Sequence, residues 1–251
     1  MKVKEVALFG GIGNKLFQIA HGEWLRRMGF SVVFVDFSYK SSFLVYKALR
    51  WTKHEDWLTL QNVFNHDKFL LPSFMQQVIF IIEFILLRLQ RKEGSIFKFD
   101  IGYFQNVNSN NSETIAWTAD KLKKSINNKN NLNKAIIHFR GKDFTKNHKR
   151  YQLEIIKKVI NKEKEINFYL ISDDPNAFQK EFIDHQIENL SSSQMNDFIR
   201  IMNAENLILS DSTFAFWAFV VGYSPNKKYF IGKKNLNLVD AFVKNADIEV
   251  L

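Results

Sequence analysis

The stretch from Glu5 to Phe37 most narrows the choice of folds, because it reads as strand, glycine turn, helix and strand in quick succession. Residues 5–9 alternate weakly between polar and apolar, and GGIGN follows at once. Apolar residues then recur at helical spacing up to Met28; Asn14 is the expected N-cap, and Gly29 is placed to end the helix. Residues 31–37, SVVFVDF, read as the next strand. Such a βαβ unit is right-handed and builds a parallel sheet, so we predict an α/β protein.

The second half of the sequence repeats this alternation. Strands are expected at 135–137, 166–172, 187–190, 207–209 and 229–232, with helices at 151–163, from Pro175, at 191–206, from Phe214 and at 238–243. The less regular middle contains a helix at 73–92, a short strand within 101–117 and a helix at 120–126. The Asn/Lys-rich tract at 127–134 reads as a loop. We therefore predict two domains, residues 1–133 and 134–251.

Three polar loops follow expected strands of the second half: HFRGKD from His138, SDDP from Ser172 and SDST from Ser210. Because the carboxyl ends of neighbouring parallel strands meet at one edge of a sheet, we expect these loops to converge. Arg140 can neutralise a diphosphate, the SDST turn can offer amides at a helix N-terminus, and Asp173 can accept hydrogen bonds from a ribose or base. The loops together predict a nucleotide-diphosphate site. For each loop taken singly, an ordinary helix cap or surface ion pair is the alternative.

Several other kinds of site are excluded by their missing motifs. The sequence has no G-x-x-x-x-G-K-[ST] loop, no G-x-S-x-G elbow, no HExxH pair, no Asp-x-Asp and no cysteine. The turn at GGIGN lacks the third glycine of the dinucleotide fingerprint, because position 16 is leucine. We therefore expect a site without a metal ion, in which Arg140 stabilises the charge of the leaving group.

The charge balance indicates an anionic partner. Lysine and arginine outnumber the acids 35 to 26, which gives a net charge of +9. The lysines are dispersed and no basic run alternates with aromatic residues, which disfavours nucleic acid as the partner. The alternative explanation of the lysine content is the base composition of the gene. The lack of cysteine and of a signal-peptide-like hydrophobic start favours a cytoplasmic protein.

One apolar helix, Ser73 to Lys92, has two interpretations. Its apolar run is broken by Glu83 and is too short for the roughly twenty residues that cross a bilayer. It can be a core or interdomain helix. Alternatively, it rests on anionic lipid, with Arg88, Arg91 and Lys92 at the headgroups, which would place the protein peripherally at the inner face of the cell membrane.

Four motifs, in order and in register, give the chain a family resemblance. GGIGNKLFQ begins at Gly10, HFRGKDF at His138, ISDD at Ile171 and DSTFAFW at Asp211. The chain resembles the α-1,2-fucosyltransferases of glycosyltransferase family 11, whose pattern is GG-x-GNQLFQ, H-x-RRGDY, FSDD and NSTFSWW.

The resemblance implies a GT-B-type architecture, in which two Rossmann-like domains with mainly parallel sheets face a cleft. The N-terminal domain would lie on the acceptor side and the C-terminal domain would bind the donor, GDP-fucose. Transfer would invert the anomeric carbon without a metal, onto a galactose-like hydroxyl of a surface polysaccharide or O-antigen precursor, with a lipid-linked acceptor. Arg140 would contact the diphosphate. The expected substrate-binding residues are Gly11, Gly13 and Asn14 at the cleft, Ser172 and Asp173, and Ser212, Thr213 and Phe214 near the diphosphate.

The sequence departs from the family pattern at several positions. Gly141 stands where the family has its second arginine, and further departures are Lys142 for glycine, Lys15 for glutamine, Asp211 for asparagine and Phe216 for tryptophan. The alternatives are therefore a related donor such as GDP-colitose, or a diverged nucleotide- or polyanion-binding protein without activity.

Three side chains near the central motif are candidates for the catalytic base: Asp143, which we favour, His138 and His148. Asp143 can equally hold Arg140 in place. A reaction in which the departing phosphate takes the proton needs no base from the protein.

Overall fold

The computed structural model describes residues 2–37, 42–49, 60–64, 68–104, 112–126, 134–142, 145–231 and 248–250. The chain divides into two compact units, Met1–Ser125 and Ile126–Leu251. The boundary expected from the sequence, after residue 133, follows a tract at 127–133 that lies outside the described residues.

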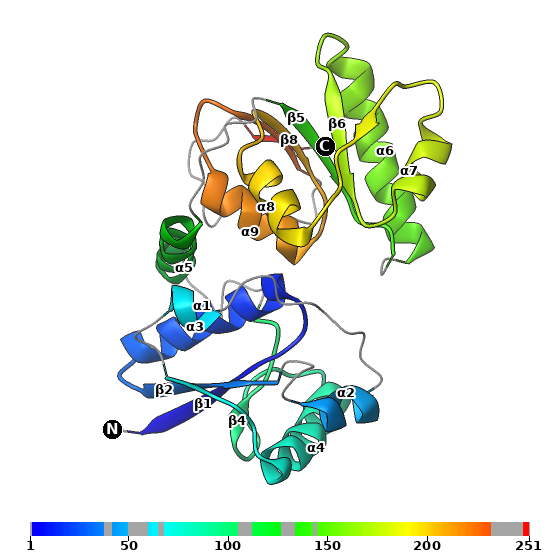
Figure 1. Cartoon of the computed structure of the whole chain (residues 1–251). Coiled ribbons are helices and arrows are strands. Elements are labelled where there is room, and N and C mark those ends of the chain that lie inside the picture. Colours follow the sequence, from blue (N-terminus) through cyan, green and yellow to red (C-terminus); the bar gives the residue numbers. More distant parts are fainter. Residues whose placement is uncertain are drawn as a thin grey trace. The chain divides into compact units, whose positions relative to one another are not determined.

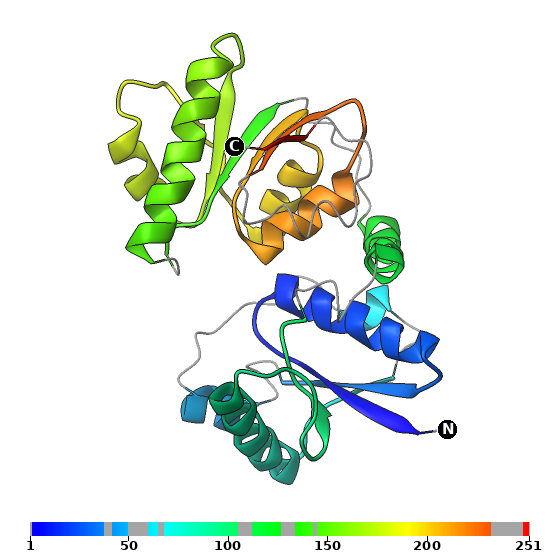
Figure 2. The ribbon, with the colours of Figure 1, turned by 180° about the vertical axis from the view of Figure 1, so that it is seen from behind.

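Unit 1 is built on a four-stranded parallel sheet with the order β3-β2-β1-β4. Its strands are β1 (Val3–Leu8), β2 (Ser31–Asp36), β3 (Lys68–Leu70) and β4 (Phe99–Asp100). Its helices are α1 (Ile12–Arg27), α2 (Phe43–Leu49), α3 (Leu60–Val63), α4 (Phe74–Gln90) and α5 (Ser112–Ser125). Figures 1 and 2 show α1 and α4 on opposite faces of this sheet. The βαβ unit predicted for residues 5–37 is confirmed.

Three local predictions in unit 1 need correction. The N-cap of α1 is Gly11 and not Asn14, whose N–H already donates to the carbonyl of Gly11 (3.0 Å) in the first turn. The short strand β4 lies at 99–100, just before the range 101–117 in which it was expected. The last helix begins at Ser112 and so is longer than the predicted 120–126.

Helix α4 belongs to the core of unit 1, as the first of its two interpretations predicts. Ser73 caps it with a capping box, and Phe80 and Leu87 are buried in the hydrophobic cluster of the unit. Glu83 is fully buried, and its carboxylate accepts the backbone N–H groups of residues 96, 97, 98 and 99 at 2.6–3.1 Å. The glutamate therefore fixes the chain that leads into β4. Among the described residues, no helix is long and apolar enough to cross a membrane.

Unit 2 is built on a six-stranded sheet with the order β10-β9-β8-β5-β6-β7, and every pair is parallel. Its strands are β5 (Ala135–Phe139), β6 (Phe168–Ser172), β7 (Glu188–Asn189), β8 (Asn206–Leu209), β9 (Lys228–Ile231) and β10 (Ile248–Val250). Its helices are α6 (Lys146–Lys162), α7 (Pro175–Glu181), α8 (Gln194–Met202) and α9 (Thr213–Gly222). In Figure 1, α6 and α7 cover one face of the sheet and α8 and α9 the other.

Each strand predicted in the second half is present, and β10 is an additional one. The closing helix predicted at 238–243 lies outside the described residues.

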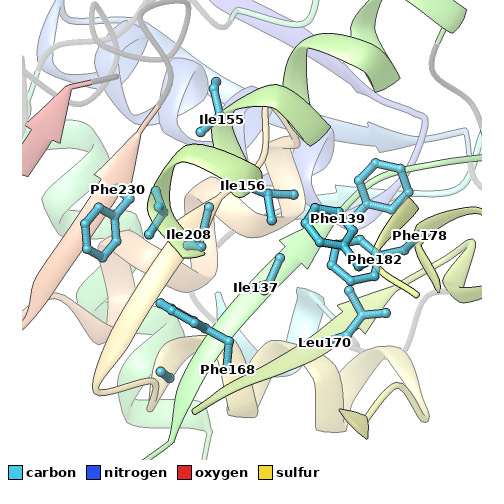
Figure 3. Packing of buried hydrophobic residues seen from close by; sticks show 12 residues of the cluster. Ile137, Phe139, Ile155, Ile156, Phe168, Leu170, Phe178, Phe182, Ile208 and Phe230 are labelled. Atoms are coloured by element: carbon cyan, nitrogen blue, oxygen red, sulfur yellow. The ribbon is translucent and has the colours of Figure 1, made fainter. Parts of the chain in front are cut away.

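The core of unit 2 holds its central strand in place. Ile137 and Phe139 of β5 pack with Ile156 of α6, and the rings of Phe178 and Phe182 stack at 4.4 Å beside them (Figure 3). Close packing of this kind resists displacement, so the backbone at the end of β5, from which Arg140 follows, is held in a fixed position.

Both sheets share one connectivity. Counted from its first strand, unit 2 has the order 3-2-1-4-5-6 of the Rossmann fold, and unit 1 has the order 3-2-1-4. The chain thus moves outward from its first strand in one direction and then returns to the other side of it. This reversal creates a topological switch point between β1 and β4 in unit 1 and between β5 and β8 in unit 2. The predicted fold class, α/β with two Rossmann-like parallel-sheet domains, is confirmed.

Candidate functional site

The three polar loops of unit 2 leave the sheet at one edge. Strand β5 pairs with β8, with Ile137 opposite Ile208, and with β6, with Phe139 opposite Ser172. Arg140 after β5, Asp173 after β6 and Ser210 after β8 therefore emerge from adjacent strands. This edge includes the switch point between β5 and β8, where open α/β sheets bind ligands.

Arg140 is held by residues of two other elements. Its Nε lies 3.4 Å from Oδ2 of Asp173, and its backbone N–H donates to Oε1 of Gln152 on α6 (3.3 Å). The side chain is 28% exposed, which leaves it accessible to a solute. A guanidinium with a fixed carboxylate partner on one side is oriented before any anion arrives, which reduces the entropy lost on binding.

Asp173 organises the loop after β5. Its Oδ1 accepts the backbone N–H of Gly141 at 2.6 Å and that of Lys142 at 3.4 Å, while Oδ2 pairs with Arg140. From the sequence, this carboxylate was predicted to accept hydrogen bonds from a ribose or base. In the structure, both of its oxygens already have partners within the chain. Ser172 acts similarly inside its own turn, because its Oγ accepts the N–H of Asp174 (2.9 Å) and its N–H donates to Ser191.

Gly141 packs directly against the next loop. A Cβ built on this residue would lie 2.4 Å from Cβ of Asp174, which is the N-cap of α7. Real Cβ atoms essentially never approach so closely. The loop can run beside α7 only with glycine at position 141. The family that this chain resembles has its second arginine at this position, but here there is no room for a side chain.

His138 is a buried neutral imidazole. Its Nδ1 lies 2.5 Å from Oγ of the buried Ser210, which joins the end of β5 to the end of β8. Burial, assisted by the charge of Arg140, lowers the pKa of His138 to about 3. A ring that is hydrogen-bonded, buried and so weakly basic is a poor proton acceptor at neutral pH. Among the three candidate bases, His138 is therefore the least favoured, and its contact with Ser210 suits a positioning role.

The SDST turn leads into α9. Ser212 is the N-cap of this helix but makes no side-chain capping hydrogen bond, unlike the caps Asp174 of α7 and Ser193 of α8. Thr213 and Phe214 form the first turn, and both are partly exposed. The amides of a first helical turn have no carbonyl partner inside the helix and carry the positive end of the dipole. The turn thus places the N-terminus of a helix, where an anion would be stabilised, at the end of the strand next to β5.

Two polar side chains of α6 face the switch point. Nε2 of His148 lies 3.4 Å from Oδ2 of Asp211. Gln152 is buried, and its Nε2 has no hydrogen-bond partner among the described residues. A cavity of about 10 Å³ lies between Gln152, His138, Ser210 and Asp211, which is room for about one water molecule.

Gln152 is a residue of this edge that was not predicted from the sequence. One signal in the sequence could have found it. Gln152 lies three residues before Ile155 and four before Ile156, so it is a polar residue on the apolar face of the predicted helix.

The glycine turn of unit 1 occupies the other switch point. Gly10 has a φ of +78° and Gly11 is the N-cap of α1, while Gly13 is buried and Asn14 half-buried in the first turn of the helix. Gln18 accepts the N–H of Phe9 (2.9 Å) and donates to the carbonyl of Gly102 (3.1 Å), so it ties the end of β1 to the chain after β4.

Lys15 is buried next to this turn. Its Nζ lies 3.1 Å from Oδ1 of Asp36 at the end of β2. The lysine that replaces the family's glutamine thus has an acidic partner in the same unit.

The remaining candidate, Asp143, lies outside the described residues. No group of three acidic or histidine side chains that could hold a metal ion occurs in the part of the chain that the structure describes. A groove of about 410 Å³ lies at the opposite edge of the unit 2 sheet, where Asn167 and Glu188 stand at the start of β6 and β7. It is separate from the polar loops.

Comparisons with known proteins give likenesses in structure and none in sequence. No family model and no curated protein matches the chain. It is similar to the fucosyltransferase NodZ from Bradyrhizobium, with 13% identity over 88% of this chain and 94% of that one (TM-score 0.43). It is also similar to a family 9 glycosyl transferase from Veillonella parvula, with 11% identity over 100% and 85% (0.47), and to the E. coli heptosyltransferase WaaC, with 11% over 100% and 93% (0.41). Likeness at this level carries no conclusion about activity, which must come from the residues of the site.

Proposed function

We propose that this protein is an inverting glycosyltransferase of the family 11 type, which transfers L-fucose from GDP-fucose to a galactose-like hydroxyl in α-1,2 linkage. The single observation that supports it most is Arg140, which stands at the switch point of a Rossmann-like sheet, oriented by Asp173 and beside the start of α9. The four motifs in register give the donor and the linkage, which the geometry alone does not.

A diphosphate suits this edge of the sheet for two reasons. The guanidinium of Arg140 can donate two parallel hydrogen bonds to phosphate oxygens. The first turn of α9, at Thr213 and Phe214, offers amides and a positive dipole end to the same group.

The reaction exchanges one bond at the anomeric carbon for another. The acceptor oxygen forms a bond to this carbon while the bond to the β-phosphate oxygen breaks, and GDP leaves with the electron pair. Arg140 and the start of α9 stabilise the negative charge that develops on the leaving phosphate. The acceptor hydroxyl's proton passes to a base or to the departing phosphate. Asp143 and the partly exposed His148 are the favoured candidate bases, and His138 is the weakest candidate because burial lowers its pKa to about 3.

The remaining parts of the proposal follow from the resemblance. The acceptor is an oligosaccharide precursor of a surface polysaccharide or O-antigen, carried on a lipid, and the enzyme works in the cytoplasm without a metal ion. A related GDP-deoxysugar is the alternative donor, because Gly141 replaces an arginine that would stand beside the diphosphate.

Calorimetric titration of GDP, GDP-fucose and UDP in EDTA tests the proposal. The wild type is expected to bind the two guanine compounds and not UDP. In Arg140→Ala the affinity should fall roughly 10- to 150-fold, the effect of losing one or more charge-assisted hydrogen bonds. Arg150→Ala is the matched control, because Arg150 lies on α6 and is 82% exposed in an ion pair with Glu154.

Two results would redirect the proposal. Binding of GDP-fucose without release of fucose to any acceptor or to water favours a non-catalytic nucleotide-binding protein. No binding of any guanine nucleotide, or equal losses in Arg140→Ala and Arg150→Ala, contradicts a diphosphate site at Arg140.

A further inference from the structure

The face of α4 that points away from the core of unit 1 is apolar and exposed. The exposed apolar residues are spaced three, four or seven positions apart, which places them along one side of the helix and its lead-in. We call them the α4 patch: Leu71, Phe74, Met75, Ile82, Ile85 and Leu89. Leu89 is 76% exposed and Phe74 68%, whereas Ile82 and Ile85 are about half exposed at 49% and 45%.

The patch is not a misplaced part of the core. The opposite side of α4 already contributes Phe80, Glu83 and Leu87 to the interior, and Figure 1 shows α4 at the edge of unit 1 with the sheet on one side only. Isolated exposed apolar residues are normal on protein surfaces. Five of them along one side of a helix, with Leu71 just before it, are a concentration of the kind that marks an interaction site.

The exposed charges on α4 and on the two residues that follow it are all basic, and the exposed Glu93 comes directly after them. Arg88, Arg91 and Lys92 are all exposed at the carboxyl end of α4. The sole acidic residue of the helix, Glu83, is buried on the other side and its carboxylate is used by four backbone N–H groups. The helix thus combines an apolar stripe with basic residues at its end, and it carries no exposed acid. This combination is complementary to a surface with an apolar layer beneath anionic groups.

We propose that the α4 patch docks on an anionic membrane surface, with α4 lying in the plane of the headgroups. The six apolar side chains would enter the interface, and Arg88, Arg91 and Lys92 would contact lipid phosphates. A second copy of the chain is a poorer partner, because it brings the same basic cluster and the same net charge of +9. The proposal does not depend on the nucleotide site, which belongs to the other unit.

Vesicle flotation with the full chain tests this proposal directly. The wild type is expected to float with vesicles of phosphatidylcholine and phosphatidylglycerol in equal parts, and to remain unbound with phosphatidylcholine alone. Leu89→Glu and Ile82→Glu should each lower the partition coefficient about tenfold or more, because each removes one buried apolar side chain from the interface. Replacement of Arg88, Arg91 and Lys92 by glutamine should lower it by a similar factor and remove its dependence on salt.

The matched control is Ile183→Glu. Ile183 is 83% exposed on a loop of unit 2, so it tests an exposed apolar side chain outside the patch. Circular dichroism and thermal unfolding check that each variant is folded. Three results would overturn the proposal: no flotation of the wild type with anionic vesicles, equal losses in Ile183→Glu and Leu89→Glu, or a wild-type dimer in solution that Leu89→Glu converts to a monomer. None of these assays contains a nucleotide, so their outcome is separate from that of the calorimetric test.

Discussion

Restoring the family's second arginine at position 141 should harm this protein. The Cβ of any residue other than glycine would lie 2.4 Å from Cβ of Asp174, whereas ordinary contacts begin near 3.4 Å. Either the loop after β5 or the start of α7 must therefore move by about 1 Å, and overpacking of this kind costs about 1–3 kcal/mol. The same movement would separate the N–H of Gly141 from Oδ1 of Asp173, now 2.6 Å away.

Gly141→Ala isolates the steric effect, and Gly141→Arg adds the charge. We expect Gly141→Ala to lower the midpoint of thermal unfolding by roughly 2–12 °C, from the overpacking energy and the size of the chain. We expect Gly141→Arg to weaken GDP binding in calorimetry rather than improve it, because displacement of the loop also displaces Arg140. Lys142→Ala is the control for stability, since the Lys142 side chain is exposed and its N–H is retained.

An unchanged unfolding midpoint in Gly141→Ala would refute the close packing of this loop against α7. Tighter GDP binding by Gly141→Arg would show that the loop tolerates a side chain, and that the departure from the family pattern is a loss of binding energy rather than a consequence of packing.

Three further predictions concern the residues that hold the site and unit 1 together. Asp173→Ala should lower the affinity for GDP in calorimetry by about tenfold or more, because the carboxylate orients both Arg140 and the N–H of Gly141. Asp173→Asn should cause a smaller loss. An unchanged affinity in the alanine variant would contradict that role. Because the pKa of His138 falls from its ordinary 6.5 to about 3 on folding, the unfolded chain binds more protons between these values, and stability should fall as the pH drops through this range, by up to about 1.4 kcal/mol per pH unit. Urea unfolding at several pH values should show this contribution in the wild type but not in His138→Asn, and parallel pH profiles would exclude it. Glu83→Ala should destabilise unit 1 by more than about 3 kcal/mol, because it leaves four backbone N–H groups without their acceptor. Glu181→Ala is the control: this glutamate is exposed, and its loss should change stability by less than about 1 kcal/mol in the same denaturation assay.

The spacing of apolar residues, together with the turn and capping residues between the apolar segments, was enough to predict the alternation of strands and helices. The apolar runs at 31–37 and 135–137 read as strands, and the run at 135–137 is followed by polar residues and then by a helical pattern at 151–163. Since a chain of this kind builds parallel sheets, the convergence of Arg140, Asp173 and the SDST turn at one edge followed as well. These are local or topological properties, which need no knowledge of side-chain packing.

What the side chains do at that edge was decided only by the tertiary structure. The sequence cannot show that Asp173 is engaged by Gly141 and Arg140, that His138 is buried against Ser210, or that Gly141 has Asp174 as its neighbour, because each contact joins segments that are far apart along the chain. Glu83 is the clearest case: in the sequence it interrupts an apolar helix, and in the structure it accepts four N–H groups from residues 96–99. Hydrogen bonding and burial depend on which groups meet in three dimensions, so they appear only when the sheet and its helices are assembled.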